Sequence, residues 1–170
     1  LMIADPFSAV LELLYTLPGL DKNPMTAIAI LSEIGPDMSV FPSSKHLVSW
    51  AGCCPRNDQS NQKVKSRRIS RAGCYLKPLL VQVANALIKS KKHPEFKERY
   101  RRIKSHRGHK KAIIAVCKML LTAIWNMLSK LEPYNPDGFL EHRPVNEKRV
   151  LTKSQALELL RLRGCTITND

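Results

Sequence analysis

The feature that most constrains the fold is a 22-residue segment, 110–131, whose apolar residues repeat with the period of an α-helix. The steps between successive apolar positions are four, three, four, three and four residues: Ile113, Cys117, Leu120, Ile124, Met127 and Leu131. A second apolar row beside them widens the stripe, as in a helix packed inside a protein. No strand-length alternation of apolar and polar residues occurs, so we expect an all-α fold built around this core helix.

Five shorter helices are expected before it, at 7–17, 24–34, 44–51, 74–89 and 94–105. Asn23 followed by Pro24 is a preferred helix start, with a capping amide and proline at the first helical position. The segment 78–88 contains no charged residue, so the fourth of these helices is expected to be buried almost all round.

The first two helices are joined by Pro18-Gly19 and resemble the helix-hairpin-helix module. That module binds DNA by pointing backbone N–H groups at phosphate oxygens, so Pro18 and Gly19 are candidate phosphate-binding positions. Asp21 stands where the usual hairpin has a second glycine, and a carboxylate facing phosphate is unfavourable. The alternative is a plain αα-hairpin that packs against the core.

Between two of the expected helices lies a polar segment, 54–73, with neither a helical stripe nor an apolar run. Loops of this length inside a domain are uncommon and tend to be functional or disordered. It contains one acidic residue, Asp58, and six basic ones: Arg56, Lys63, Lys65, Arg67, Arg68 and Arg71. A polyanion is the partner that such a loop is suited to bind.

The charge distribution supports the same partner. The window 56–111 contains 18 Lys and Arg against three acidic residues, a balance of +15, whereas the rest of the chain balances at −1 (10 against 11). An excess gathered in one third of the chain is typical of an electrostatic binding surface. Neutralising several phosphates at once would make affinity strongly dependent on salt.

Other classes of function have weaker support. The five cysteines form no C-x-x-C pair and do not combine with histidines at ligand spacing, so we predict no metal site and reduced thiols in a cytoplasmic protein. No apolar run reaches the ~18 residues of a membrane span, so no membrane partner is expected. The chain starts at Leu1 in a segment that already resembles structure, which suggests a fragment or a truncated reading frame.

The order of short motifs resembles the C-terminal domain of the Piv/MooV-type transposases, the insertion-sequence family called IS one-ten, one-sixteen and nine-oh-two. The resemblance runs from residue 14 to residue 134, and each motif alone is weak. The motifs are Leu17-Pro18-Gly19, the run AIAILSEIG at 27–35, the run FPSSKHL at 41–47, Trp50-Ala51-Gly52, Pro55, Gln59-Ser60, the run RISRAG at 68–73, Tyr75-Leu76, His93-Pro94 and the run RGHKKA at 107–112.

The resemblance implies DNA transposition or site-specific recombination, with DNA (element ends and target) as partner. It further implies a catalytic serine, which would be Ser60 after Gln59, although Asn61 stands where the family usually has glycine. A metal-binding acidic cluster would lie in a separate N-terminal domain. No cofactor is therefore expected in this fragment, Mg²⁺ is expected in that domain, and the fragment alone is expected to bind DNA without recombining it. An element-encoded guide RNA and a homo-oligomer (dimer or tetramer) are further implied partners.

The candidate nucleic-acid-binding residues come from the loop, the fifth expected helix and the start of the core helix. They are Arg56, Gln59, Lys63, Lys65, Arg67, Arg68, Ser70, Arg71, Lys97, Arg101, Arg102, Lys104, Lys110 and Lys111. Trp50, Tyr75 and Trp125 could stack on bases, but their apolar neighbours favour the core. We expect a transposase-type domain at 1–134 and an extended tail at 135–170 with one short amphipathic helix.

Three functions remain open from the residues. The first is the catalytic-serine part of a transposase, and the second is a non-enzymatic helix-hairpin-helix DNA-binding module. The third is a scaffold whose basic surface holds a guide RNA.

Overall fold

The computed structural model describes residues 7–54, 58–60, 63–66 and 73–136. The chain divides into two compact units, Leu1–Pro136 and Asp137–Asp170. The second unit, with the predicted tail and its short helix, lies outside the described residues. All that follows concerns the first unit.

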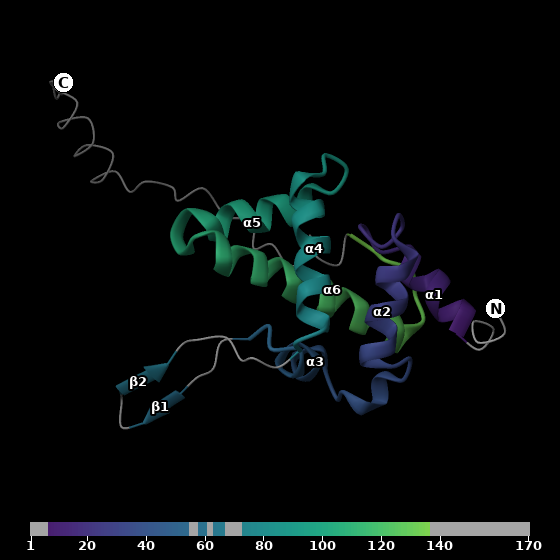
Figure 1. The fold of residues 1–170 in the computed structure, drawn as a ribbon, viewed down its shortest axis with the longest axis horizontal. Coiled ribbons are helices and arrows are strands. Elements are labelled where there is room, and N and C mark those ends of the chain that lie inside the picture. Colours follow the sequence, from purple (N-terminus) through teal and green to yellow (C-terminus); the bar gives the residue numbers. More distant parts are fainter. Residues whose placement is uncertain (1–6, 55–57, 61–62, 67–72, 137–170) are drawn as a thin grey trace, which may run out of the picture. The chain divides into compact units, whose positions relative to one another are not determined.

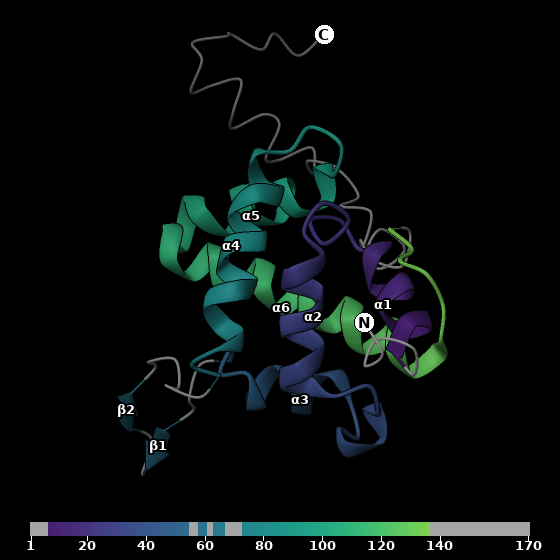
Figure 2. The ribbon, with the colours of Figure 1, turned by 45° about the vertical axis from the view of Figure 1, so that its right-hand side comes forward.

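The helix predicted from the long apolar stripe is the centre of this unit. It is α6 (His109–Lys130), and ten of its side chains are buried. The elements that pack around it are α1 (Ser8–Tyr15), α3 (Ser44–Trp50), α4 (Leu76–Lys89), α5 (Pro94–Arg107) and the short 3₁₀ helix η2 (Met38–Val40). Helix α2 (Pro24–Ile34) packs instead on α1 and α4 (Figures 1 and 2). The predicted all-helical architecture is therefore confirmed.

The length and composition of α6 would also suit a membrane span, and among the described helices it alone passes that test. Its surroundings give the physical reason for the apolar composition. More than half of its apolar window, 56%, is buried inside the protein against the other helices. This is the pattern of a core helix.

The helix boundaries follow the capping signals in the sequence. Asn23 caps α2, because its side-chain oxygen accepts a hydrogen bond from the Thr26 N–H at 3.3 Å, and Pro24 is the first helical residue. At the N-terminus of α3 the Ser43 hydroxyl makes no capping bond and instead contacts His46 Nδ1 at 2.9 Å. Gly108, at φ 78°, separates α5 from α6.

Two expectations need correction. The charge-free helix α4 is not buried all round, because Pro78, Gln82 and Ala86 are exposed along one side. The absence of charge therefore did not indicate complete burial: proline, glutamine and alanine are uncharged and still tolerate water.

The other correction concerns the polar segment 54–73, which we call the basic loop. It contains a two-stranded antiparallel ribbon, β1 (Asp58–Ser60) and β2 (Lys63–Ser66). Strands of three and four residues are too short to leave the apolar–polar alternation that predicts a strand from sequence.

We predict that Asn23→Ala lowers the free energy of unfolding by about 1 kcal/mol, because one N–H in the first turn of α2 loses its acceptor. Ser43→Ala is the matched control, since that hydroxyl caps nothing in α3. Urea denaturation followed by circular dichroism measures both. A loss for Ser43→Ala as large as that for Asn23→Ala would contradict the capping assignment.

Candidate nucleic-acid interface

The basic loop leaves the helical body and returns to it at a single point. Ala51, the last residue before Gly52, touches Gly73: a Cβ built on Gly73 would lie 2.4 Å from the Ala51 carbonyl oxygen. Gly73 also has φ +65°, a conformation that side chains disfavour. We call this contact the neck of the loop. After it the Lys77 N–H donates to the Gly73 carbonyl at 2.9 Å, and α4 follows.

Within the loop, the strand register places Ser60 at the end of β1. It pairs with Lys63, so only Asn61 and Gln62 separate the two in sequence. The register shifts between Asp58 and Gln59. The structure thus describes backbone positions for Gln59, Ser60, Lys63 and Lys65, whereas five candidate residues lie outside the described part: Arg56, Arg67, Arg68, Ser70 and Arg71.

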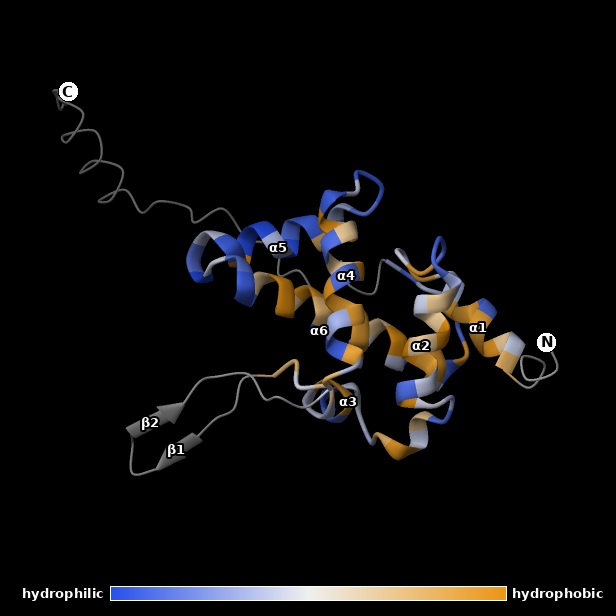
Figure 3. Ribbon diagram, viewed as in Figure 1, coloured by the Kyte–Doolittle hydropathy of each residue, from blue (hydrophilic) through white to orange (hydrophobic). Residues whose placement is uncertain are grey.

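Helix α5 carries the densest charge of the described part, with six Lys or Arg against two Glu. It is held to the core by Phe96, which is fully buried, while Arg101, Arg102 and Lys104 are exposed and Lys97 is half-buried. Figure 3 shows this contrast, with α5 mostly hydrophilic and the adjoining α6 mostly hydrophobic.

Arg99 on α5 lies beside another guanidinium. Partial burial, and to a smaller extent the neighbouring Arg102 guanidinium, lower the pKa of Arg99 from its usual value. Arginine stays charged in proteins, so Arg99 contributes to the positive charge of α5.

Where α5 meets α6, three side chains form a cluster that sequence reasoning missed. The Tyr100 hydroxyl lies 2.8 Å from His109 Nδ1, their rings meet edge to face, and the Lys104 ammonium lies 5.5 Å from the centre of the Tyr100 ring. Lys110 and Lys111 follow, both exposed. The cluster holds the ends of two helices together, and with them Lys104, Lys110 and Lys111. The one sequence signal for this cluster is the glycine at 108, which ends one helix and lets the next turn back beside it.

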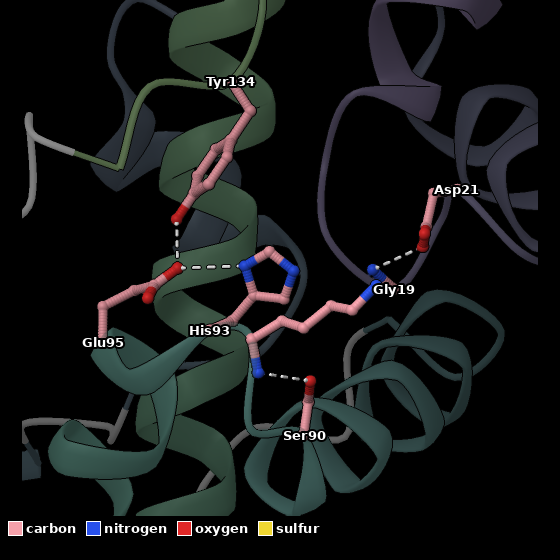
Figure 4. A network of polar contacts seen from close by, with 7 residues as sticks. Gly19, Asp21, Ser90, His93, Glu95 and Tyr134 are labelled. Carbon is pink, nitrogen blue, oxygen red and sulfur yellow. Dashed lines mark hydrogen bonds and ion pairs between the residues drawn. The ribbon is translucent and has the colours of Figure 1, made fainter.

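The other end of α5 is fixed by a partly buried polar network (Figure 4). The Tyr134 hydroxyl donates to Glu95 Oε1 at 3.1 Å, and His93 Nδ1 lies 3.6 Å from the same oxygen. Burial, followed by the Glu95 charge and hydrogen bond, raises the pKa of Tyr134. The phenol therefore stays protonated and serves as a donor. Tyr134 also stacks on Phe96, so the chain after α6 clamps the start of α5.

The Pro18-Gly19 turn is built into the core. A Cβ on Gly19 would lie 2.8 Å from Val83 Cγ1 of α4, and Pro18 is buried. The Gly19 N–H, which a phosphate would need, donates to the Asp21 carboxylate at 3.1 Å (Figure 4). The helix-hairpin-helix arrangement is thus not confirmed, and the geometry favours the alternative of a packed αα-hairpin.

Two of the three aromatic residues that were predicted to lie in the core are exposed at the surface. Tyr75 is 72% exposed and Trp50 is 44% exposed, so the core expectation was wrong for both. Trp125 is half-buried, and its Nε1–H donates to the Phe41 carbonyl at 3.0 Å. Apolar sequence neighbours misled the prediction because Trp50 and Tyr75 stand at helix ends, where neighbours in sequence do not share a buried face.

The cysteines and carboxylates of the described residues do not assemble into a metal site. Cys53 and Cys117 are buried free thiols, and burial raises the pKa of Cys53 to about 11 and that of Cys117 to about 12. At neutral pH both are therefore protonated. Within the described part of the chain, no three His, Cys, Asp or Glu residues lie close enough to hold a metal ion.

Comparisons with known proteins agree with the order of motifs. The family model described as Transposase IS116/IS110/IS902 family matches residues 11–101. The chain belongs to this family. It is 30% identical over 126 residues to the pilin gene-inverting protein of Moraxella bovis, and 29% identical over 126 residues to that of Moraxella lacunata.

Each of these alignments covers 73% of this chain and 38% of the relative, so the chain corresponds to well under half of those proteins. No solved structure matches the chain. The family match itself spans α1 to the middle of α5 and includes the neck and the ribbon.

We predict that Gly73→Ala lowers the free energy of unfolding more than Gly108→Ala. Both glycines have positive φ, but a Cβ at Gly108 meets nothing within 4 Å, whereas one at Gly73 collides with backbone. Strain alone costs on the order of 1–3 kcal/mol, and the collision adds to it. Hydrogen exchange at the Lys77 amide should also accelerate in Gly73→Ala. Equal unfolding midpoints and unchanged exchange would contradict the neck contact.

Proposed function

We propose that this chain is the DNA-binding and catalytic-serine part of a transposase or site-specific recombinase. In this proposal α5, the start of α6 and the basic loop bind phosphates of the DNA, and Ser60 attacks one phosphodiester. Family membership supports the reaction class, and the pilin gene-inverting relatives carry a DNA rearrangement in their name.

The observation that carries the proposal is the separation of charge along the described body. Residues 7–54 hold two basic and four acidic side chains, a balance of −2, whereas residues 73–136 hold 14 basic and three acidic, a balance of +11. An uneven distribution on one folded unit favours binding of a polyanion over a general role in solubility.

The proposed reaction is a transesterification. The Ser60 oxygen forms a bond to phosphorus, one P–O bond of the DNA strand breaks, and the serine proton passes, directly or through a base, to the leaving sugar oxygen, which becomes a free hydroxyl. Serine is a weak nucleophile at neutral pH and needs activation. Lys63, which stands opposite Ser60 in the ribbon, and the other basic loop residues would stabilise the developing charge on the phosphate.

The rest of the machinery follows from the resemblance alone. We propose that an N-terminal domain of the full-length protein supplies the Mg²⁺ site, that a guide RNA and a homo-oligomer take part, and that the 170-residue chain alone binds DNA without recombining it. The helix-hairpin-helix module loses support because the Gly19 N–H already has a partner.

We predict that Arg101→Gln/Lys104→Gln makes binding of duplex DNA less dependent on salt. Each lost phosphate contact reduces the slope of log affinity against log salt by ~0.9, so the double variant should lower it by ~2. Fluorescence anisotropy of a labelled duplex across a salt series measures the slope.

The matched control for that experiment is Lys22→Gln/Lys45→Gln. It removes the same charge from exposed positions in the part of the body that balances at −2. An equal fall of the slope in both double variants would contradict a binding surface on α5.

We predict that Ser60→Ala in the full-length protein abolishes a covalent protein–DNA adduct while affinity for element-end DNA stays within about twofold. The reason is that the substitution removes the nucleophilic oxygen and no charge. Denaturing gel electrophoresis of labelled DNA detects the adduct.

Ser66→Ala is the control in the same ribbon, because Ser66 pairs with Asp58 at the end opposite Ser60. It should retain the adduct. An adduct that persists in Ser60→Ala would remove the catalytic assignment, and binding with no adduct in any protein would favour the non-enzymatic module or the RNA scaffold. A preference for element-derived RNA over duplex DNA would single out the scaffold.

A further inference from the structure

Two large aromatic side chains stand exposed at the neck of the basic loop. Trp50 is the last residue of α3 and precedes Ala51, and Tyr75 follows Gly73 by two residues at the start of α4. With 44% and 72% of their surfaces exposed, both side chains present apolar area to water. Single exposed apolar residues are ordinary, but here two aromatic rings flank the same point of the chain.

The neck contact limits how far apart they can be. The Ala51 Cα lies 3.1 Å from the position that a Cβ on Gly73 would take. Trp50 is one residue before Ala51, and Tyr75 is two residues after Gly73. At 3.8 Å per residue, their Cα atoms lie within about 16 Å of one another.

The Trp50 ring is also supported from within the protein. It packs at 60° on Phe41, with ring centres 5.6 Å apart. Phe41 is buried and accepts the hydrogen bond from Trp125 Nε1–H of α6. One side of the indole is therefore held by the core while the rest of it faces solvent, which reduces the entropy lost when a ligand stacks on it.

We propose that Trp50 and Tyr75 form a stacking platform for unpaired DNA bases next to the phosphate bound by the loop. The inference rests on the proposed function, because the basic loop must hold the strand whose bases the rings receive. Aromatic faces stack on any base, and a basic surrounding attracts the backbone, which together describe a site for single-stranded nucleic acid. Strand exchange requires such unpaired bases beside the cleaved phosphodiester.

The test compares the 170-residue chain with its variants on two probes, oligothymidylate and the duplex of oligothymidylate with oligodeoxyadenylate. Trp50→Leu and Tyr75→Leu should each weaken binding to the single strand by about 5- to 150-fold and leave duplex binding within about twofold. Tyr75→Phe should keep the single-strand affinity, since the ring remains. Met25→Ala is the control, because Met25 is also 72% exposed and lies on α2.

A spectroscopic readout keeps the test independent of folding defects. The chain has two tryptophans, and Trp125 supports Phe41 through its hydrogen bond, so Trp125 is left in place. Oligothymidylate should quench the indole fluorescence of the unaltered chain, as stacking on Trp50 requires. It should not quench that of Trp50→Leu, in which Trp125 is the remaining indole. Unquenched fluorescence, or equal losses on single strand and duplex in the leucine variants, would overturn the platform while leaving phosphate binding intact.

The remaining outcomes separate the two proposals. If the unaltered chain binds neither probe, the proposed function fails and the platform fails with it. Tighter binding of oligouridylate than of oligothymidylate would overturn DNA as the ligand and assign the rings to RNA.

Discussion

Burial of the apolar stripe of α6 determines where the other helices of this unit pack. Ten side chains of that helix are withdrawn from water, and fully burying each larger one is worth roughly 1.5–3 kcal/mol. Among the described residues, α1, α3, α4, α5 and η2 pack against α6 and cover this stripe. The outward side of α5 is strongly basic, because its anchor is Phe96 and most of its remaining length is charged. The position of the charge thus follows from the packing of the core.

The same packing explains how a long polar loop can belong to a folded unit. Its two ends meet where Gly73 lies against the Ala51 carbonyl, a contact too close for any side chain. α3 and α4 both pack on α6, so the neck is held from both sides. A loop closed in this way returns the chain to the place it left, and the helices on either side need not adjust to it. Ser60 stands at the end of β1 within this excursion.

Sequence reasoning predicted the helices well, because period-3.6 stripes and the Asn23-Pro24 start are local signals that packing reinforces. It missed the ribbon, because strands of three and four residues are too short to leave a period-two pattern. It also misplaced Trp50 and Tyr75, since exposure at a helix end depends on how elements meet in space. The Tyr100–His109 and Tyr134–Glu95 contacts join residues that no local pattern connects. The sequence predicted the concentration of positive charge at the candidate interface. The neck and the contacts that hold the two ends of α5 could be seen only in the structure.

The chain combines a basic helix, held by side-chain contacts at both ends, with a basic loop that is closed at the neck. The family match covers both the loop and half of that helix. In the proposed function the helix would bind the DNA backbone through contacts that carry no sequence information, as phosphate contacts do. The loop would bring the serine to one phosphate, and the exposed rings would receive the bases that become unpaired there. The helix depends on its charge for this role, the loop on its closed neck, and the rings on their exposed surface.

In the proposed function DNA lies on α5, the start of α6 and the ribbon. The decisive measurement is a titration with a short duplex, followed through amide chemical shifts by heteronuclear NMR. We expect the largest changes at Arg101, Lys104, Lys110 and Lys111 and in the ribbon from Ser60 to Lys63, all of them weakened by added salt. Changes confined to α1, α2 and Gly19, with the amides of α5 unmoved, would contradict this placement.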